Sequence, residues 1–112
     1  MKIDKGLMAG STPLMLLSML AEGDKYGYEI IQELSARSDQ TFQLKEGTLY
    51  PILHSLEKSG EVISYTGPST SGKPRKYYRL TKQGEAALRE RREQWKNFCG
   101  MVNAVVFGTA HA

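Results

Sequence analysis

The segment EGTLYPILHSLEKSGEVISYTGPSTSGKPRKYYRLT, residues 46–81, decides the fold. Apolar residues recur at helical spacing in its first third, so we predict a helix over residues 47–59. β-branched and aromatic residues then predict two strands, at 62–65 and 76–80. The loop between them, residues 66–75, is rich in Gly, Pro and Ser and carries Lys and Arg. A helix followed directly by a basic hairpin is the layout of a winged helix.

The helix predicted over 47–59 has one apolar face and one polar face. The polar face is made of small side chains and contains no acidic residue. Pro51 suits only the first turn of a helix, so we expect the helix to begin near Gly47 or Thr48. A recognition helix enters the major groove of DNA by its N-terminal residues. The candidates for DNA contacts on this helix are Thr48, Tyr50, Pro51 and His54, together with Lys58 on the same polar face.

The hairpin loop supplies positive charge next to that face. Lys73, Arg75 and Lys76 stand on its far limb, where they are placed to reach phosphates or the minor groove. Residues 1–72 hold six basic and nine acidic side chains, whereas residues 73–96 hold nine basic and three acidic ones. A positive second half suits a polyanion such as double-stranded DNA. The plain alternative is a solvated hairpin with solubilising Lys and Arg side chains.

Two further helices are predicted upstream. Thr12 and Pro13 are typical of the start of a helix, and the residues that follow are apolar on most sides. Asp24 is suited to cap a second helix over residues 25–37. Gly27 in the first turn of that helix lowers its helix propensity, which predicts a close approach by another helix at this point.

Tyr26 and Tyr28 flank this glycine and are candidates for contacts with DNA phosphates. Packing at the edge of the domain is an equally good interpretation of both side chains. Further along, the alternation of polar and apolar residues over 41–44 allows a short strand, which would add a third strand to the hairpin.

The last helix is predicted to follow Thr81 as its N-cap and to run from residue 82 to about residue 106. Apolar residues lie seven positions apart along it, and a helix this long cannot bury its far end on a domain this small. We therefore expect it to pair with a second copy of the chain. The residues expected at this dimer interface are Leu88, Trp95, Phe98, Cys99 and Val102.

Several classes of protein are excluded by the sequence. No apolar run is long enough to cross a membrane and no signal-peptide pattern is present, so we expect a cytoplasmic protein. Cys99 has no second cysteine to pair with, and we expect it to be a small buried hydrophobe. Residues 67–73 have the spacing of a phosphate-binding loop, but Pro74 stands where Ser or Thr would bind magnesium. His54 and His111 make no zinc set with one Cys, so we expect no metal, no cofactor and no enzyme.

Four segments resemble the PadR family of bacterial transcriptional regulators. They are YGYEI at 26–30, EGTLYPIL at 46–53, LEKSG at 56–60 and KPRKYYRLT at 73–81. The resemblance extends over about residues 12–98. It implies a winged helix-turn-helix repressor that dimerises through its C-terminal helix and binds an inverted-repeat operator.

The single short C-terminal helix resembles the small branch of that family. In some members of the branch the dimer encloses a cavity lined by aromatic residues, which binds planar hydrophobic compounds. Trp95 stands at the matching place, whereas Tyr26 replaces the His that is frequent in the family. The resemblance thus adds a small aromatic ligand as a candidate partner, with plain dimer packing as the alternative role of Trp95.

We therefore predict a mainly α protein with a small β-hairpin. A winged helix-turn-helix DNA-binding domain would span residues 1–81, and a C-terminal dimerisation helix with a tail would span residues 82–112. The predicted function is that of a homodimeric transcriptional regulator, a repressor that binds operator DNA and is released by a small aromatic or hydrophobic effector. The alternative is a winged helix that serves as a protein-interaction scaffold and binds neither DNA nor an effector.

Overall fold

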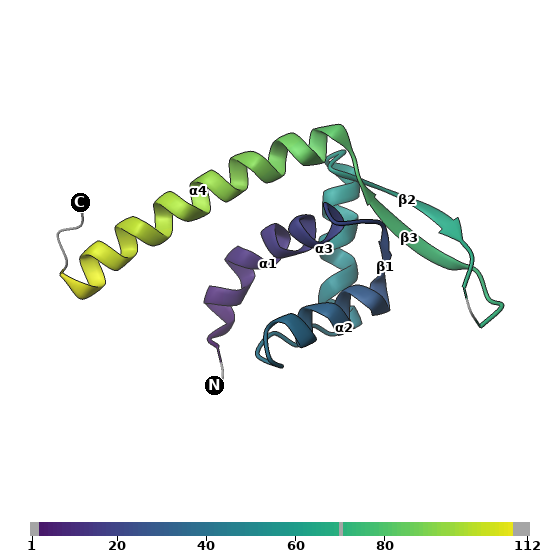
Figure 1. The fold of residues 1–112 in the computed structure, drawn as a ribbon, viewed down its shortest axis with the longest axis horizontal. Coiled ribbons are helices and arrows are strands. Elements are labelled where there is room, and N and C mark those ends of the chain that lie inside the picture. Colours follow the sequence, from purple (N-terminus) through teal and green to yellow (C-terminus); the bar gives the residue numbers. More distant parts are fainter. Residues whose placement is uncertain (1–2, 70, 109–112) are drawn as a thin grey trace.

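The computed structural model describes residues 3–69 and 71–108, which form four α-helices and a three-stranded antiparallel sheet (Figure 1). Thr70, His111 and the rest of the predicted tail beyond residue 108 lie outside the described residues. The elements in chain order are α1 (Lys5–Leu20), β1 (Lys25–Tyr26), α2 (Gly27–Arg37), α3 (Glu46–Lys58), β2 (Val62–Gly67), β3 (Arg75–Leu80) and α4 (Lys82–Phe107). The predicted mainly α fold with a winged helix-turn-helix is confirmed.

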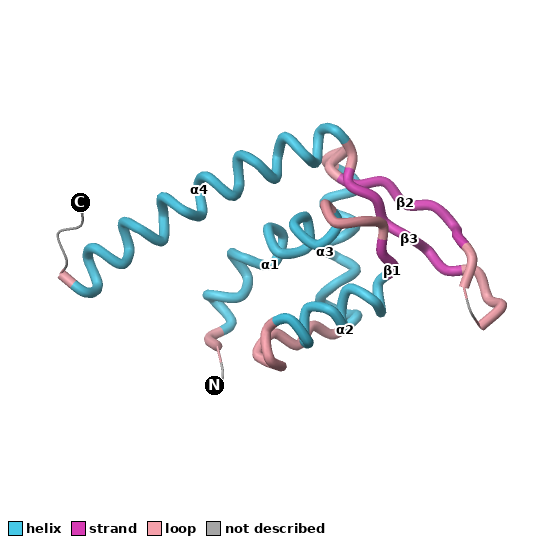
Figure 2. Tube along the Cα trace, in the orientation of Figure 1, coloured by secondary structure: helices cyan, strands magenta, loops and turns pink. Residues whose placement is uncertain are grey.

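The three strands are arranged in the order β1-β3-β2 (Figure 2). Strands β2 and β3 form the predicted hairpin, with Tyr65 opposite Tyr77, and Tyr26 of β1 pairs with Tyr77 from the other side. The third strand therefore precedes α2, and the prediction of a strand at 41–44 is wrong. Leu44 is buried in the core from an irregular segment that links α2 to α3, so its apolar character reflects packing and not pairing.

Helix α1 begins eight residues earlier than predicted, at Lys5 and not at Pro13. Asp4 caps it by accepting a hydrogen bond from the backbone N–H of Gly6 at 2.8 Å. Pro13 lies inside the helix and not at its start. The hydroxyl of Thr12 donates to the carbonyl of Met8 at 2.7 Å, so Thr12 bonds back along the helix instead of capping its first turn.

Helix α2 begins at Gly27, after a two-residue strand, and not at residue 25 as predicted. The backbone N–H of Tyr26 donates to Glu29 Oε1 at 3.3 Å, which closes the first turn. Asp24 is not the cap of this helix. Its carboxylate instead accepts hydrogen bonds from Arg79 of β3, 55 residues away.

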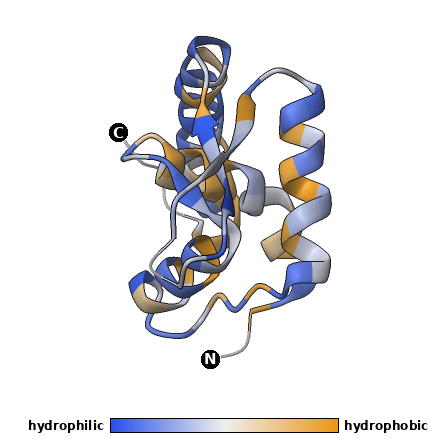
Figure 3. Cartoon of the chain, turned by 90° about the vertical axis from the view of Figure 1, so that its right-hand side faces the viewer, coloured by the Kyte–Doolittle hydropathy of each residue, from blue (hydrophilic) through white to orange (hydrophobic). Residues whose placement is uncertain are grey.

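Helix α3 matches its prediction to within one residue at each end. Leu49, Leu53 and Leu56 are buried, as the apolar stripe predicts. Pro51 is the sixth residue of the helix, beyond the first turn where we expected it, and it lies on the exposed side. In Figure 3 apolar residues, in orange, alternate with polar residues, in blue, along the helices. Buried residues of α1, α2, α3 and both hairpin strands form one hydrophobic core.

Helix α4 divides into two parts. Its first turns carry the buried residues Gly84 and Leu88, and it lies against α1. Its second part projects from the body on the side opposite to the hairpin, which gives the chain its extents of 56 × 32 × 21 Å (Figure 1). The Thr81 cap is as predicted, since its hydroxyl accepts a hydrogen bond from the Gly84 N–H at 2.9 Å.

Candidate nucleic-acid interface

The polar face of α3 is open to solvent. Thr48, Pro51, His54 and Lys58 are all exposed, on the side opposite to the buried leucines of the same helix. An exposed helix face with hydroxyl, imidazole and ammonium groups offers donors, acceptors and an apolar surface to base edges and phosphates. The structure thus brings four of the five candidates on this helix onto one surface.

Tyr50, the fifth candidate, lies elsewhere. It is half-buried and packs against the core, and its hydroxyl lies against Gly27 in the first turn of α2. The close approach that Gly27 predicted is therefore real, and Tyr50 is the group that approaches. This placement makes Tyr50 a spacer between the two helices of the helix-turn-helix.

The two tyrosines at the start of α2 have different surroundings. Tyr28 is 53% exposed on the first turn of the helix. Tyr26 is half-buried, with its ring edge-on to Tyr77 at 5.5 Å between centroids. The guanidinium of Arg75 lies 4.4 Å from the centre of the Tyr26 ring, a distance typical of a cation–π contact. Tyr28 is free to meet a ligand, whereas Tyr26 supports an arginine of the hairpin.

The basic residues of the hairpin are accessible. Lys73 and Lys76 are exposed and Arg75 is half-exposed. The limb that carries them is held by Tyr77, whose hydroxyl donates to the carbonyl of Pro68 at 2.8 Å. Within the described part of the chain, no carboxylate forms a salt bridge with Lys58 or with these three hairpin residues. Their charges are therefore available to an external anion.

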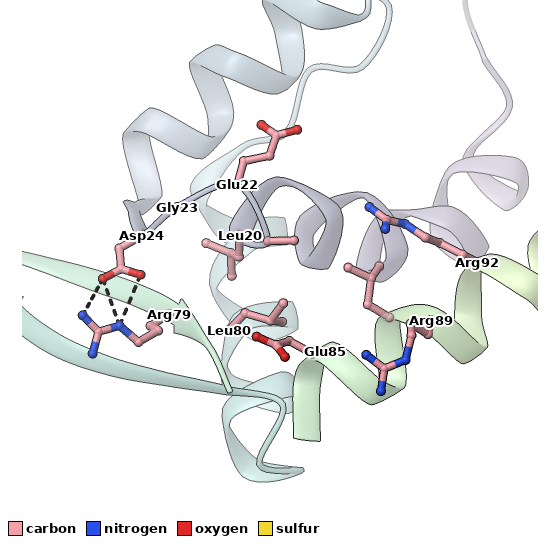
Figure 4. A pocket seen from close by; sticks show the side chains of 11 residues that line it. Leu20, Glu22, Gly23, Asp24, Arg79, Leu80, Glu85, Arg89 and Arg92 are labelled. Carbon is pink, nitrogen blue, oxygen red and sulfur yellow. Dashed lines mark hydrogen bonds and ion pairs between the residues drawn. The ribbon is translucent and has the colours of Figure 1, made fainter. Parts of the chain in front are cut away.

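An ion pair that the sequence did not predict fixes the base of the hairpin (Figure 4). Arg79 Nη2 of β3 lies 2.8 Å from Asp24 Oδ2, and the hydroxyl of Tyr65 on β2 donates to the same oxygen. The hydrogen bonds from Arg79 and then from Tyr65 lower the pKa of the Asp24 carboxyl. No local pattern reveals this group, because its members lie in three separate segments. It ties both strands of the hairpin to the turn between α1 and α2.

Apolar side chains are exposed along the second part of α4. The exposed fraction is 41% for Trp95, 61% for Phe98 and 38% for Val102, whereas Cys99 is half-buried. Met101 and the last three residues of the helix are also exposed. Leu88, which was predicted to belong to the same interface, is instead 3% exposed in the core of the protomer.

An open pocket lies where Trp95 faces α1 and α2. Its volume is about 460 Å³, and apolar side chains form most of its wall. They are Leu14, Met15, Met19, Leu34, Phe42 and Trp95. A space of this size and chemistry suits a small apolar or aromatic molecule.

Two other kinds of feature are absent from the described residues. No three side chains among His, Cys, Asp and Glu lie together there as metal ligands. None of the helices described is both long enough and apolar enough to cross a membrane.

Comparisons with known proteins agree with this geometry. A model of the transcriptional regulator PadR-like family matches residues 16–90. "Uncharacterized protein X" of Lysinibacillus sphaericus is 42% identical over 89 residues, which cover 80% of this chain and 82% of that protein. Transcriptional regulator Rv3488 of Mycobacterium tuberculosis is 34% identical over 98 residues, with 88% and 85% covered.

Solved structures give the same result. A transcriptional regulator from Clostridium thermocellum is similar with a TM-score of 0.83 and 36% identity, covering 90% of this chain and 95% of that one. A PadR family transcriptional regulator from Eggerthella lenta has a TM-score of 0.78 and 36% identity, with 90% and 86% covered.

Proposed function

This chain belongs to the PadR-like family of transcriptional regulators, and we propose that it is a homodimeric repressor that binds double-stranded DNA at an inverted-repeat operator. The family is one of regulators and not of enzymes. The observation that carries the proposal is the exposed, acid-free face of α3, followed along the chain by a hairpin in which Lys73, Arg75 and Lys76 form no salt bridge with a described carboxylate.

The two parts of this surface have different roles in the proposal. Thr48, Pro51 and His54 read base edges, because Thr48 and Pro51 lie on the exposed face in the N-terminal half of α3 and His54 follows on the same face about one turn further on. Lys58 and the hairpin residues Lys73, Arg75 and Lys76 contact phosphates, and so does the exposed phenol of Tyr28. Tyr26 and Tyr50 act indirectly, since the first supports Arg75 and the second separates α2 from α3.

A second copy of the chain is the proposed occupant of the apolar stripe on α4. Trp95, Phe98 and Val102 would otherwise remain in water, together with the valines and phenylalanine at the end of the helix. Contiguous apolar surface of this kind marks an interface in soluble proteins. A twofold dimer also presents two recognition helices, which is the arrangement that an inverted repeat requires.

The proposed effector is a small aromatic or hydrophobic molecule that binds beside Trp95. The apolar pocket of about 460 Å³ supports this assignment, because it has the volume and the lining that such a ligand needs. An effector releases DNA only if it binds better to the conformation that does not fit the operator. The pocket is lined by α1, α2 and α4, so a ligand there acts on the contact between the dimer helix and the DNA-binding helices.

Selection of bound fragments from the source genome tests the proposal. We expect enrichment of fragments that share an inverted repeat, and a reporter gene placed behind that repeat should be repressed by the protein. Binding should weaken steeply as salt is raised, because phosphate contacts release counterions. Failure to bind any fragment, or binding that does not change with salt, would favour the protein-interaction scaffold.

Titration of aromatic compounds tests the effector separately. Binding beside Trp95 should change the fluorescence of this single tryptophan and weaken operator affinity together. A compound that changes the fluorescence but leaves operator affinity unchanged would show a ligand site without a regulatory role.

A further inference from the structure

The turn that follows α3 also contacts the first turn of α4. Glu61 follows Gly60 at the end of the recognition helix, and its carbonyl oxygen accepts hydrogen bonds from the N–H and the hydroxyl of Thr81, both at 3.1 Å. Gly84, in the first turn of α4, lies so close that a Cβ added there would be 2.0 Å from the same carbonyl oxygen. Backbone contact therefore joins the end of α3 to the beginning of α4.

A side-chain contact joins the same two helices at a second point. Arg91, seven residues beyond Gly84 on α4, places Nη2 3.1 Å from Glu61 Oε1. The other carboxylate oxygen of Glu61 accepts a hydrogen bond from the hydroxyl of Ser59. The side chain of Glu61 is only 10% exposed, so its charge depends on these partners.

Packing against α1 and the burial of Leu88 hold the first turns of α4, and the Arg91–Glu61 pair adds a direct link between α4 and the turn after α3. The contact between Gly84 and the Glu61 carbonyl fixes the start of α4, and the Arg91–Glu61 pair fixes the helix about two turns further on. The neighbouring Arg92 is exposed and has no salt bridge to a described residue, so this role is specific to Arg91.

We propose that Arg91 and Glu61 are positioning residues for operator recognition, which hold α3 at a fixed angle to α4. The inference rests on the proposed function, in which α4 joins two protomers and α3 enters the major groove. Under that arrangement, the angle between α3 and α4 sets the distance between the two recognition helices. That distance selects operators whose half-sites lie one helical turn apart, about 34 Å.

The test measures affinity for operators that differ only in spacing. Fragments carry the selected inverted repeat with its natural spacer, or with one base pair added or removed, and binding is followed by fluorescence anisotropy at one salt concentration. The variants are Arg91→Met, which keeps the apolar stem but removes the guanidinium, and Arg91→Lys, which keeps a charged donor. Arg92→Met is the matched control, because it removes the same charge from the adjacent position.

The wild type is expected to prefer the natural spacing by about tenfold, a difference of about 1.4 kcal/mol. Arg91→Met should lose most of this preference, whereas Arg91→Lys and Arg92→Met should retain it. Equal spacing preference in Arg91→Met and the wild type would overturn the proposal. Equal loss in Arg91→Met and Arg92→Met would also overturn it, since charge alone would then explain the effect.

A double variant separates positioning from plain stability. Arg91→Met leaves a buried carboxylate without its cation, and Glu61→Gln in the same chain removes that charge. Thermal unfolding should therefore show recovered stability in the double variant, while the spacing preference stays lost because the link is still broken. If the double variant recovers both thermal stability and spacing preference, the Arg91–Glu61 pair has only a structural role. Absence of operator binding by the wild type would instead overturn the proposed function, and this inference with it.

Discussion

The hydroxyl of Tyr50 occupies the space that a side chain on Gly27 would need. A Cβ built on Gly27 would lie 2.3 Å from the Tyr50 oxygen and 2.8 Å from the ring carbon that bears it. The first turn of α2 and helix α3 therefore approach each other through a glycine and a tyrosine ring. The separation of the two helices depends on both residues.

Gly27→Ala should destabilise the fold by about 1–3 kcal/mol, the usual cost of overpacking a filled site. The half-buried Tyr50 ring must move, and α3 moves with it. Urea unfolding measures the cost. Gly47→Ala is the control, since nothing lies within 4 Å of a Cβ at Gly47, and it should be neutral or stabilising by up to about 1 kcal/mol. Equal stability of the two variants would show that Tyr50 turns aside freely.

Gly84→Ala should cost more than Gly27→Ala, about 3 kcal/mol or above. The obstacle is the backbone carbonyl of Glu61, which cannot rotate away as a side chain does. The expected result is a lower midpoint of thermal unfolding than in the Gly47→Ala control. A Gly84→Ala chain with wild-type stability would mean that the joint between α3 and α4 is loose.

Asp24→Asn should destabilise the fold by at most about 1 kcal/mol near neutral pH, because Arg79 is more than half exposed and water screens the pair. The pKa of Asp24 is lowered in the fold, so its contribution is present above the unfolded pKa and is lost as pH falls through the folded one. Urea unfolding should therefore show a difference between wild type and Asp24→Asn at pH 6 that shrinks below about pH 4. A difference that persists unchanged in acid would show that the effect is not the ion pair.

Lys73→Ala and Lys76→Ala should each flatten the dependence of operator affinity on salt. Each substitution removes one phosphate-binding ammonium group from each protomer and so two from a dimer, and the slope of log K against log salt should fall by about 1.8. Affinity measured at several salt concentrations gives this slope. Lys96→Ala, on the exposed surface of α4, is the control and should leave the slope nearly unchanged. If Lys73→Ala, Lys76→Ala and Lys96→Ala all keep the slope of the wild type, the hairpin does not contact DNA phosphates.

Phe98→Asp should convert the proposed dimer to a monomer, because it places a charge in the apolar stripe of α4. Sedimentation equilibrium measures the change in mass. Asn97→Asp introduces the same charge at the adjacent exposed residue outside the stripe and should leave the dimer intact. If both variants keep the mass of a dimer, the two protomers meet through another surface.

Helix α3 and the hairpin were predicted well because their signals are local. The leucine stripe of α3 and the β-branched and aromatic residues of β2 and β3 point to the same elements that the structure contains. The Thr81 cap is local too, since it acts on an N–H three residues away. The predicted start of α1 was wrong because Thr12 and Pro13 are also tolerated inside a helix. There the Thr12 hydroxyl donates a hydrogen bond to the carbonyl of Met8.

The predictions that were wrong concern residues whose partners are distant in the sequence. Asp24 has the right residue type for a helix cap, but Arg79 is the stronger partner for its carboxylate. Leu88 shares the heptad spacing of Trp95, yet it faces the protomer core. A helical wheel gives the direction of a side chain on its own helix, and only the tertiary structure shows what lies in that direction.

The length of α4 gives the protein a mechanical property. Its 26 residues form a rod about 39 Å long, and its contacts with the turn after α3, at Gly84 and Arg91, lie in its first half. A sideways displacement of about 3 Å at the far end corresponds to a tilt of only about 4° at the attached end. Under the proposed function, a large movement of the exposed apolar residues at the tip therefore corresponds to only a small rotation of the helix that is proposed to contact DNA.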